Sequence, residues 1–187
     1  MTMTADSPIN APTWAIRPEL PIDLDLVHEL HRAAFPGPVE AELVDAIRSS
    51  PWFVPEGSLV AVTEDGSVLG HVLLSQVTLE PDGAPATEVL ALAPLAVLPP
   101  HQGRGIGTAL TRAALAAGDM RPEPMTVVLG APAFYRRFGF EAARFHDIDG
   151  PWQGAGDAFQ VRVRPGLQEL PTGTVVYPPA FSAAGPA

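Results

Sequence analysis

Residues 95–108 read LAVLPPHQGRGIGT and join an apolar run to a segment with helical periodicity. Glycines at positions 103, 105 and 107 let the backbone approach a ligand closely, and the first amides of a helix lack partners within it. These amides and the helix dipole together make a site for an anion such as a pyrophosphate. The stretch therefore predicts a phosphate-binding loop between a strand and a helix.

Three kinds of phosphate-binding motif place a glycine-rich loop between a strand and a helix. A P-loop requires Gly-Lys followed by Ser or Thr, and the chain contains no lysine, which excludes it. A dinucleotide fingerprint requires Gly-x-Gly-x-x-Gly in a parallel βαβ unit, whereas these glycines are two residues apart and follow a predicted antiparallel meander. That alternative is disfavoured but stays open. The third pattern, Gln-x-x-Gly-x-Gly, is met by Gln102, Gly105 and Gly107.

The periodicity of apolar residues around the loop predicts a mixed α+β layout, with helices on a mostly antiparallel central sheet. An Asp-Gly turn at residues 65–66 favours a hairpin, and Asp23 is the expected cap of the first helix. Helices are expected at residues 23–35, 39–49, 106–120 and 132–138. Strands are expected at residues 14–20, 58–63, 68–79, 87–98, 125–129, 140–143, 158–163 and 174–177.

Composition limits the class of protein. No run approaches the roughly 20 apolar residues of a membrane span, and the first residues lack a signal-peptide layout, so we expect a cytoplasmic protein with no membrane partner. The chain has no cysteine, which excludes disulfides and thiolate nucleophiles. His28 and His31 have the only spacing that could suit a metal, and we interpret them as a solvated pair on a helix, so no metal site is expected.

Charge is unevenly distributed. The net charge of −10 argues against a nucleic-acid partner, because neutralising phosphates supplies most of that affinity. All eleven cations are arginine; six lie within residues 101–145 against three acids, whereas residues 19–88 hold thirteen acids and only Arg32 and Arg48. This division suits a phosphorylated cofactor beside one segment and a cationic amine beside the other. Surface solubility explains the acidic segment equally well.

The glycine loop and a second segment, AFYRRFGF at residues 133–140, closely resemble the two signatures of the GNAT superfamily of acetyltransferases. Residues 93–99, 128–130, 139–141 and 173–177 are similar to its YhbS-like branch of predicted acyltransferases. The resemblance implies one N-acetyltransferase domain at residues 13–187, behind a disordered lead at residues 1–12. It also implies helices on both faces of the sheet, and a strand splayed from its neighbour to form a slot for acetyl-CoA.

The cosubstrate implied by this resemblance is acetyl-CoA. Pro94 has no backbone N–H to donate, so strand-to-strand hydrogen bonding should be interrupted near it. The interruption would mark the implied slot, or it would mark only a sheet edge or a β-bulge. Arg104 would then lie among the phosphates, and Arg136 and Arg137 would reach toward the adenine end. The expected cofactor-binding residues are Leu95, Ala96, Val97, Gln102, Gly103, Arg104, Gly105, Ile106, Gly107 and Thr108.

The implied reaction is direct attack of a primary amine on the thioester. A backbone amide near Val97 would meet the developing oxyanion, and Tyr135 would protonate the leaving thiolate, although it could instead only pack beside its aromatic neighbours. For the general base we name Glu88. His71, Glu40, Glu42 and water remain open.

The acceptor is expected to be a small-molecule amine or a peptide N-terminus, and the sequence is compatible with a homodimer. Selectivity would arise from loops within residues 35–53 and 145–157, whose shapes the sequence does not specify. Two other functions stay open. One is a catalytically inactive sensor or scaffold that binds CoA or acetyl-CoA, and the other is an unrelated nucleotide-binding module.

Overall fold

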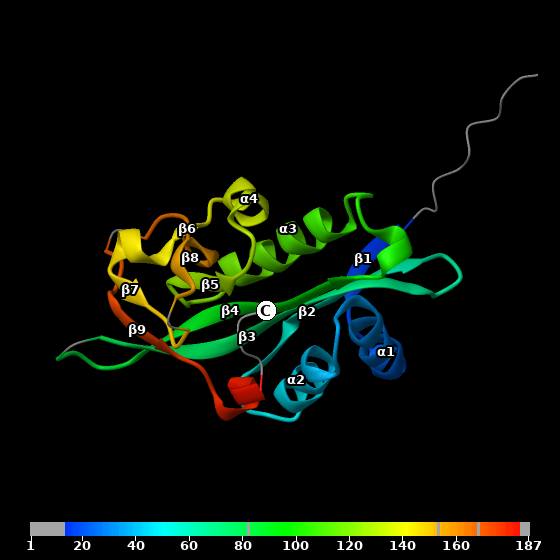
Figure 1. Ribbon diagram of the computed structural model, residues 1–187, viewed down its shortest axis with the longest axis horizontal. Coiled ribbons are helices and arrows are strands. Elements are labelled where there is room, and N and C mark those ends of the chain that lie inside the picture. The colour runs from blue at the N-terminus through cyan, green and yellow to red at the C-terminus, as the bar shows by residue number, and fades with distance from the viewer. Residues whose placement is uncertain (1–13, 82, 153, 168, 184–187) are drawn as a thin grey trace, which may run out of the picture.

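A nine-stranded sheet runs through the described chain, which comprises residues 14–81, 83–152, 154–167 and 169–183 of a computed structural model (Figure 1). The expected disordered lead at residues 1–12 lies outside these ranges. The strands are β1 (Trp14–Pro18), β2 (Phe53–Thr63), β3 (Val68–Glu80), β4 (Thr87–Val97), β5 (Met125–Leu129), β6 (Glu141–Ala142), β7 (Ile148–Asp149), β8 (Phe159–Val163) and β9 (Gly173–Val176). Their order is β1-β2-β3-β4-β5-β8-β6, with β9 beside β3 and β7 beside β9.

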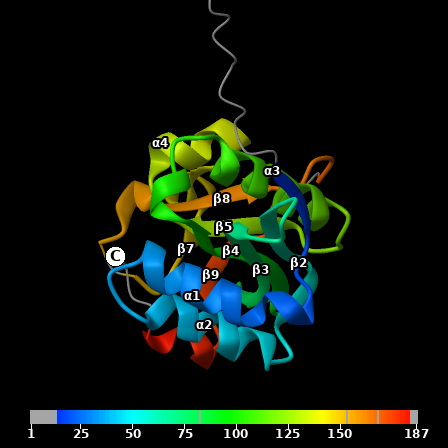
Figure 2. The same ribbon diagram turned by 90° about the vertical axis from the view of Figure 1, so that its right-hand side faces the viewer.

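Helices cover both faces of the sheet, as expected. The helices α1 (Leu24–Ala34) and α2 (Val39–Arg48) lie on one face, and α3 (Ile106–Asp119) lies on the other (Figures 1 and 2). A short helix α4 (Pro132–Tyr135) continues into a 3-10 turn, Arg136–Phe138. Further 3-10 turns are Pro21–Asp23, Pro99–His101, Ala143–His146, Gly156–Ala158 and Pro179–Ala183. Among the described residues, no helix is long and apolar enough to cross a membrane.

Apolar periodicity explains how the helices pack. In α1 the buried residues Val27, Leu30 and His31 recur at intervals of three and four, which places them on one helical face. In α3, Gly118 lies so close to the sheet that an added Cβ would come within 3.1 Å of the Leu90 side chain. Small residues in α3 therefore bring this helix close to β4.

Asp23 occupies the N-cap position of α1, as predicted, but its side chain does not cap the helix. No side-chain capping bond is present; the buried Asp23 carboxylate instead accepts hydrogen bonds from both terminal nitrogens of Arg17 and from the Leu20 amide. These bonds hold the pKa of Asp23 below its usual range. The charge-assisted hydrogen bonds from Arg17 are favoured over a single capping bond to a helix amide, because a buried carboxylate needs more than one donor.

Other elements match the predicted ones with shifted ends. The strand expected at residues 58–63 begins at Phe53, and a register shift between Phe53 and Ser58 lets it pass Pro55 and Gly57. The helix expected at residues 132–138 is divided into α4 and the 3-10 turn. The two-residue strand β7 was not predicted.

Strand β4 separates from β5 over its second half. On one edge β4 pairs with β3 from Thr87 to Val97, with a register shift opposite Val72 and Leu74. On the other edge, in the described chain, β4 pairs with β5 only at Leu90 and Ala91. The Ala93–Pro94 peptide, which is cis, lies just beyond these pairs. The expected splayed strand is therefore confirmed.

Candidate active site

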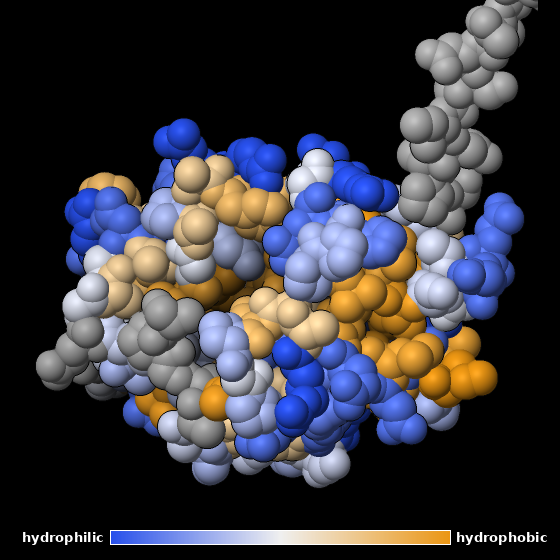
Figure 3. Space-filling view, turned by 45° about the vertical axis from the view of Figure 1, so that its right-hand side comes forward, coloured by the Kyte–Doolittle hydropathy of each residue, from blue (hydrophilic) through white to orange (hydrophobic). Residues whose placement is uncertain are grey.

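Two hollows lie along the free edge of β4, and the space-filling view shows a depression with apolar side chains at its floor (Figure 3). The loop cavity, of about 540 Å³, is lined by Leu95, Val97, His101, Gln102, Gly103, Gly105, Ile106, Gly107, Thr108, Phe134 and Arg137. The apolar cavity, of about 590 Å³, is lined by Phe35, Glu40, Leu43, Leu92, Ala93, Pro94, Leu95, Leu129, Gly130, Ala131, Pro132, Tyr135, Trp152, Gly154, Ala155, Ala158, Tyr177 and Phe181. Leu95 lines both, so the two cavities meet at the middle of the splayed edge.

The loop cavity presents unpaired backbone amides. Gly103 and Gly105 have φ values of 72° and 84°, a left-handed conformation that favours glycine. The Ala109 amide donates to the carbonyl of Gly105 and is the first to find a partner within the helix. The preceding amides of α3, from Ile106 to Thr108, therefore face the cavity with the positive end of the helix dipole, as an anion site requires.

The strand edge beside the loop presents further backbone groups. On the side that faces β3, the Leu98 amide donates a hydrogen bond to the carbonyl of Leu69. Because antiparallel strands alternate the direction of their hydrogen-bonding groups, the N–H and C=O groups of Leu95 and Val97 point away from β3 and into the opening. The side-chain amide of Gln102 already donates to the carbonyl of Val97 at 3.0 Å, which ties the loop to the end of the strand. The Leu95 groups and the Val97 amide remain for a ligand.

Most of the expected cofactor-binding residues line the loop cavity, and two do not. Ala96 is 2% exposed, and its methyl group belongs to the core. Arg104 is exposed and lies outside the lining of both cavities. Arg137 supplies the cation at the wall, where its guanidinium lies 4.6 Å from the Phe134 ring centre and its Nε donates to the Phe134 carbonyl.

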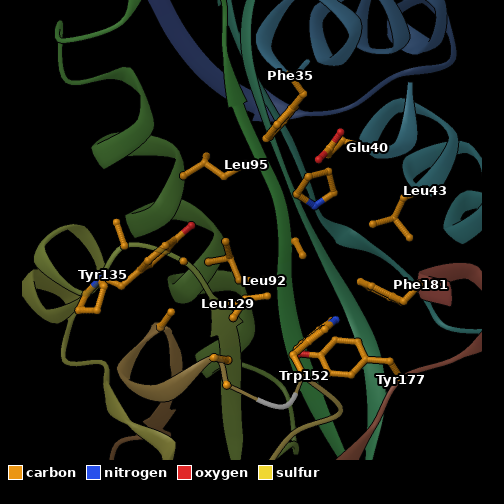
Figure 4. A pocket seen from close by; sticks show the side chains of 18 residues that line it. Phe35, Glu40, Leu43, Leu92, Leu95, Leu129, Tyr135, Trp152, Tyr177 and Phe181 are labelled. Carbon is orange, nitrogen blue, oxygen red and sulfur yellow. The ribbon is translucent and has the colours of Figure 1, made fainter. Parts of the chain in front are cut away.

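Tyr135 lines the apolar cavity, while the preceding residue Phe134 lines the loop cavity. The Tyr135 ring is 8% exposed and makes edge contacts with Phe134 and Phe140, at centroid distances of 4.9 and 5.6 Å. Its side chain reaches from α4 toward Leu92 and Leu95 (Figure 4). Burial raises the pKa of Tyr135 to about 12. The phenol is therefore protonated at neutral pH, and it faces the splayed edge.

Among the described residues, Glu40 is the one acidic side chain that lines the apolar cavity. It lies in the first turn of α2, is partly buried, and within this part of the chain forms no side-chain hydrogen bond or ion pair. In contrast, Glu88 lines neither cavity and accepts a hydrogen bond from Gln76 at 3.1 Å. Glu88 precedes Leu92 by four residues, roughly 13 Å along the strand. The structure therefore does not bring Glu88 together with Tyr135.

His31 and His71 are fully buried, which contradicts the prediction of a solvated His28–His31 pair. His31 Nε2 lies 2.9 Å from His71 Nδ1, and His71 Nε2 lies 3.0 Å from Ser58 Oγ. The Ser58 hydroxyl donates to Glu19, so it must accept from His71 Nε2, and His31 Nε2 in turn donates to His71 Nδ1. Both histidines are thus neutral. Burial lowers the pKa of His31 to about 3 and that of His71 well below its usual value.

Three aromatic side chains close the far end of the apolar cavity. Trp152 contacts Tyr177 and Tyr177 contacts Phe181, at ring centroid distances of 4.6 and 4.9 Å (Figure 4). Tyr177 directly follows β9, which pairs with β3 and so returns the end of the described chain to this site. Sequence reasoning did not assign these residues to the site, although Trp152 lies in the selectivity loop expected at residues 145–157 and Tyr177 in the segment 173–177 that carries part of the family resemblance.

A loop of helix amides, a splayed strand and a tyrosine over the gap are together the arrangement expected of an acetyltransferase. Comparisons with known proteins agree. The model of the acetyltransferase (GNAT) family matches residues 24–140. The chain is 36% identical over 168 residues to "Uncharacterized N-acetyltransferase YhbS" of Escherichia coli strain K12, covering 89% of this chain and 98% of the relative.

Two solved structures carry the same fold. The crystal structure of YhbS from Escherichia coli in complex with CoA has a TM-score of 0.80, with 33% identity and 96% coverage of each chain. A GNAT family acetyltransferase from Brucella melitensis in complex with acetyl-CoA has a TM-score of 0.73, with 32% identity, 92% coverage of this chain and 100% of that chain. The chain belongs to the GNAT family of acetyltransferases, a family that uses acetyl-CoA as its cosubstrate.

Proposed function

We propose that this protein transfers the acetyl group of acetyl-CoA to a primary amine by direct attack of the amine on the thioester. One observation carries the proposal: the loop cavity and the apolar cavity meet at Leu95, where β4 has parted from β5. A ligand held by its phosphates in the first can extend along the strand edge and present its thioester to the second.

The loop cavity would hold the diphosphate. Its amides from Ile106 to Thr108 donate to phosphate oxygens, and Arg137 adds a positive charge beside them. The free backbone groups of Leu95 pair with the amides of the pantetheine arm, which takes the position of the missing strand. Gln102 contributes indirectly, because its bond to the Val97 carbonyl fixes the angle between strand and loop.

The apolar cavity would hold the reacting groups. Glu40 accepts a proton from the acceptor ammonium, and the free amine attacks the carbonyl carbon of the thioester. The negative charge that develops on the carbonyl oxygen is met by a free backbone amide of the splayed edge between Leu95 and Val97, where the two cavities meet. As the tetrahedral intermediate collapses, the carbon–sulfur bond breaks and Tyr135 donates its proton to the departing thiolate. The second proton of the attacking nitrogen then returns the Tyr135 phenolate to a phenol, and Glu40 releases the first proton to water. Glu40 replaces Glu88 in this scheme because it lines the cavity.

The test is turnover. The purified protein is incubated with acetyl-CoA and a panel of primary amines, and free CoA thiol is measured with and without each amine. We expect thiol release that depends on an amine, with a matching acetylated product by mass spectrometry. Tyr135→Phe should lower kcat while leaving the Kd for acetyl-CoA within about twofold, because the hydroxyl acts on the leaving group and not on the phosphates. Tight acetyl-CoA binding without release for any amine would instead favour a sensor or scaffold.

A further inference from the structure

The wall of the apolar cavity has one charged side chain and many apolar ones. Glu40 is ionisable and partly buried, and no partner among the described residues engages its carboxylate. A partly buried carboxylate in an apolar wall is costly unless a cation pairs with it. The ammonium of the acceptor meets this requirement.

The aromatic side chains of the wall indicate what the rest of the acceptor is. Tyr177 contacts both Trp152 and Phe181 at the end of the cavity away from Glu40 and Phe35 (Figure 4). Burial raises the pKa of Tyr177, so its phenol stays neutral. Such a cluster offers aromatic faces and edges to a flat apolar group, and no charge.

The lining also excludes other amines. Its described residues include no lysine, arginine or histidine, so a carboxylate or phosphate on the acceptor would enter without a counterion from them. A second ammonium, as in a diamine, would lie among aromatic rings that attract it only weakly, and the described lining has no second carboxylate to pair with it. The cavity volume of about 590 Å³ lies in the usual range for a small ligand.

Resting on the proposed function, we infer that the acceptor is a small arylalkylamine: a primary amine with one positive charge and an aromatic ring. Its ammonium lies at Glu40, and its ring lies against Trp152, Tyr177 and Phe181. This class differs from amino acids, diamines and peptide N-termini, which stand as the competing outcomes of the test.

The experiment compares matched amines by thiol release at saturating acetyl-CoA. Phenethylamine is the probe, phenylalanine adds a carboxylate, putrescine replaces the ring by a second ammonium, and propylamine lacks the ring. A short peptide with a free N-terminus completes the set. We expect kcat/KM for phenethylamine to exceed that for each of the others by at least about tenfold. A preference for phenylalanine, putrescine, propylamine or the peptide would overturn the inference.

A variant pair locates the ring. Trp152→Ala should lower kcat/KM for phenethylamine at least about tenfold more than for propylamine, because only phenethylamine loses an aromatic contact. Phe145→Ala is the control, since Phe145 is 66% exposed and lines neither cavity. Equal losses for both amines in Trp152→Ala would contradict the assignment.

Titration calorimetry of phenethylamine into the protein–CoA complex separates the two proposals. Binding without thiol release from any amine would retain the arylalkylamine site and refute acetyl transfer. Release with other amines but neither binding nor release with phenethylamine would refute only the acceptor class. Absence of both binding and release for every amine would refute both.

Discussion

The ring of Tyr135 occupies the space that a Cβ on Gly130 would fill. A methyl group added at Gly130 would clash with the ring carbon Cε2 and lie 3.1 Å from Cδ2. Gly130 directly follows β5 and lines the same cavity as Tyr135. The absence of a side chain at this position therefore sets where the phenol lies relative to the splayed strand.

Gly130→Ala should lower kcat about tenfold or more by displacing the Tyr135 ring, while the Kd for acetyl-CoA stays nearly unchanged. Steady-state kinetics and calorimetry measure the two quantities. The double variant Gly130→Ala/Tyr135→Phe is the control: if the alanine acts through the phenol, adding it to Tyr135→Phe should cost little further kcat. Additive losses would show that Gly130 acts by another route.

Arg137→Ala should weaken acetyl-CoA binding roughly tenfold, because the guanidinium at the wall of the loop cavity loses its charge-assisted contact with a phosphate. Arg104→Ala is the matched control and should change the Kd by less than about twofold, since Arg104 lies outside both linings. Calorimetric titration at two salt concentrations measures the Kd for acetyl-CoA. The difference in Kd between wild type and Arg137→Ala should be smaller at the higher salt concentration, because salt screens the charge of the arginine. A larger loss in Arg104→Ala would restore the role that the sequence predicted for it.

Glu40→Gln should lower kcat/KM for an amine acceptor at least about a hundredfold at neutral pH, because the amide neither pairs with the ammonium nor accepts its proton. Glu88→Gln has the same chemistry at a site outside the cavities and should leave kcat/KM within about twofold of wild type. The rates are compared by thiol release at saturating acetyl-CoA. The reverse ranking would move the base to Glu88.

Acid should destabilise the fold through His31 and His71. Both have a folded-state pKa below the unfolded value of about 6.5, so the unfolded chain takes up protons first as the pH falls. The contribution of the two histidines to the free energy of unfolding is therefore fully present above the unfolded pKa and decreases as the pH falls below it, by ~2 kcal/mol for His31 down to pH 5.0 and further for His71. Urea unfolding at a series of pH values measures this slope.

His31→Met should remove about half of that pH dependence, even though the variant also loses stability at neutral pH. His28→Gln is the control and should keep the wild-type slope, because the His28 side chain is 30% exposed and lies outside the buried His31–His71 pair. A flat profile for the wild-type protein in this pH window would show that the two imidazoles are not held neutral.

The fold and the cofactor loop followed from local patterns. Apolar periodicity located the long strands and the main helices, and the spacing of Gln102, Gly105 and Gly107 identified the loop that the structure places at the start of α3. Those features depend on residues close together in the chain. The backbone conformation of Gly103 and Gly105 is one such local property.

The rest of the site depends on tertiary contacts that periodicity does not encode. Asp23 has the residue type and position of a helix cap, but Arg17 on β1 reaches it in space. His31 lies on the buried face of α1 with Val27 and Leu30, but its hydrogen-bond partner His71 comes from β3, which the periodicity of α1 does not reveal. Nothing in the sequence distinguishes Glu40 from Glu88 as a candidate base. Only the three-dimensional structure shows that Glu40 lines the cavity and Glu88 does not.

The two ends of the site come from different parts of the chain. The proposed cofactor site is lined mostly by residues 95–108, whereas the proposed acceptor site is lined by Phe35 and Glu40 near one terminus and by Tyr177 and Phe181 near the other. Substitutions in these outlying segments can change which amine is accepted without disturbing the glycine motif. Proteins that share this cofactor loop can therefore evolve to accept different amines while all of them keep the same acetyl donor.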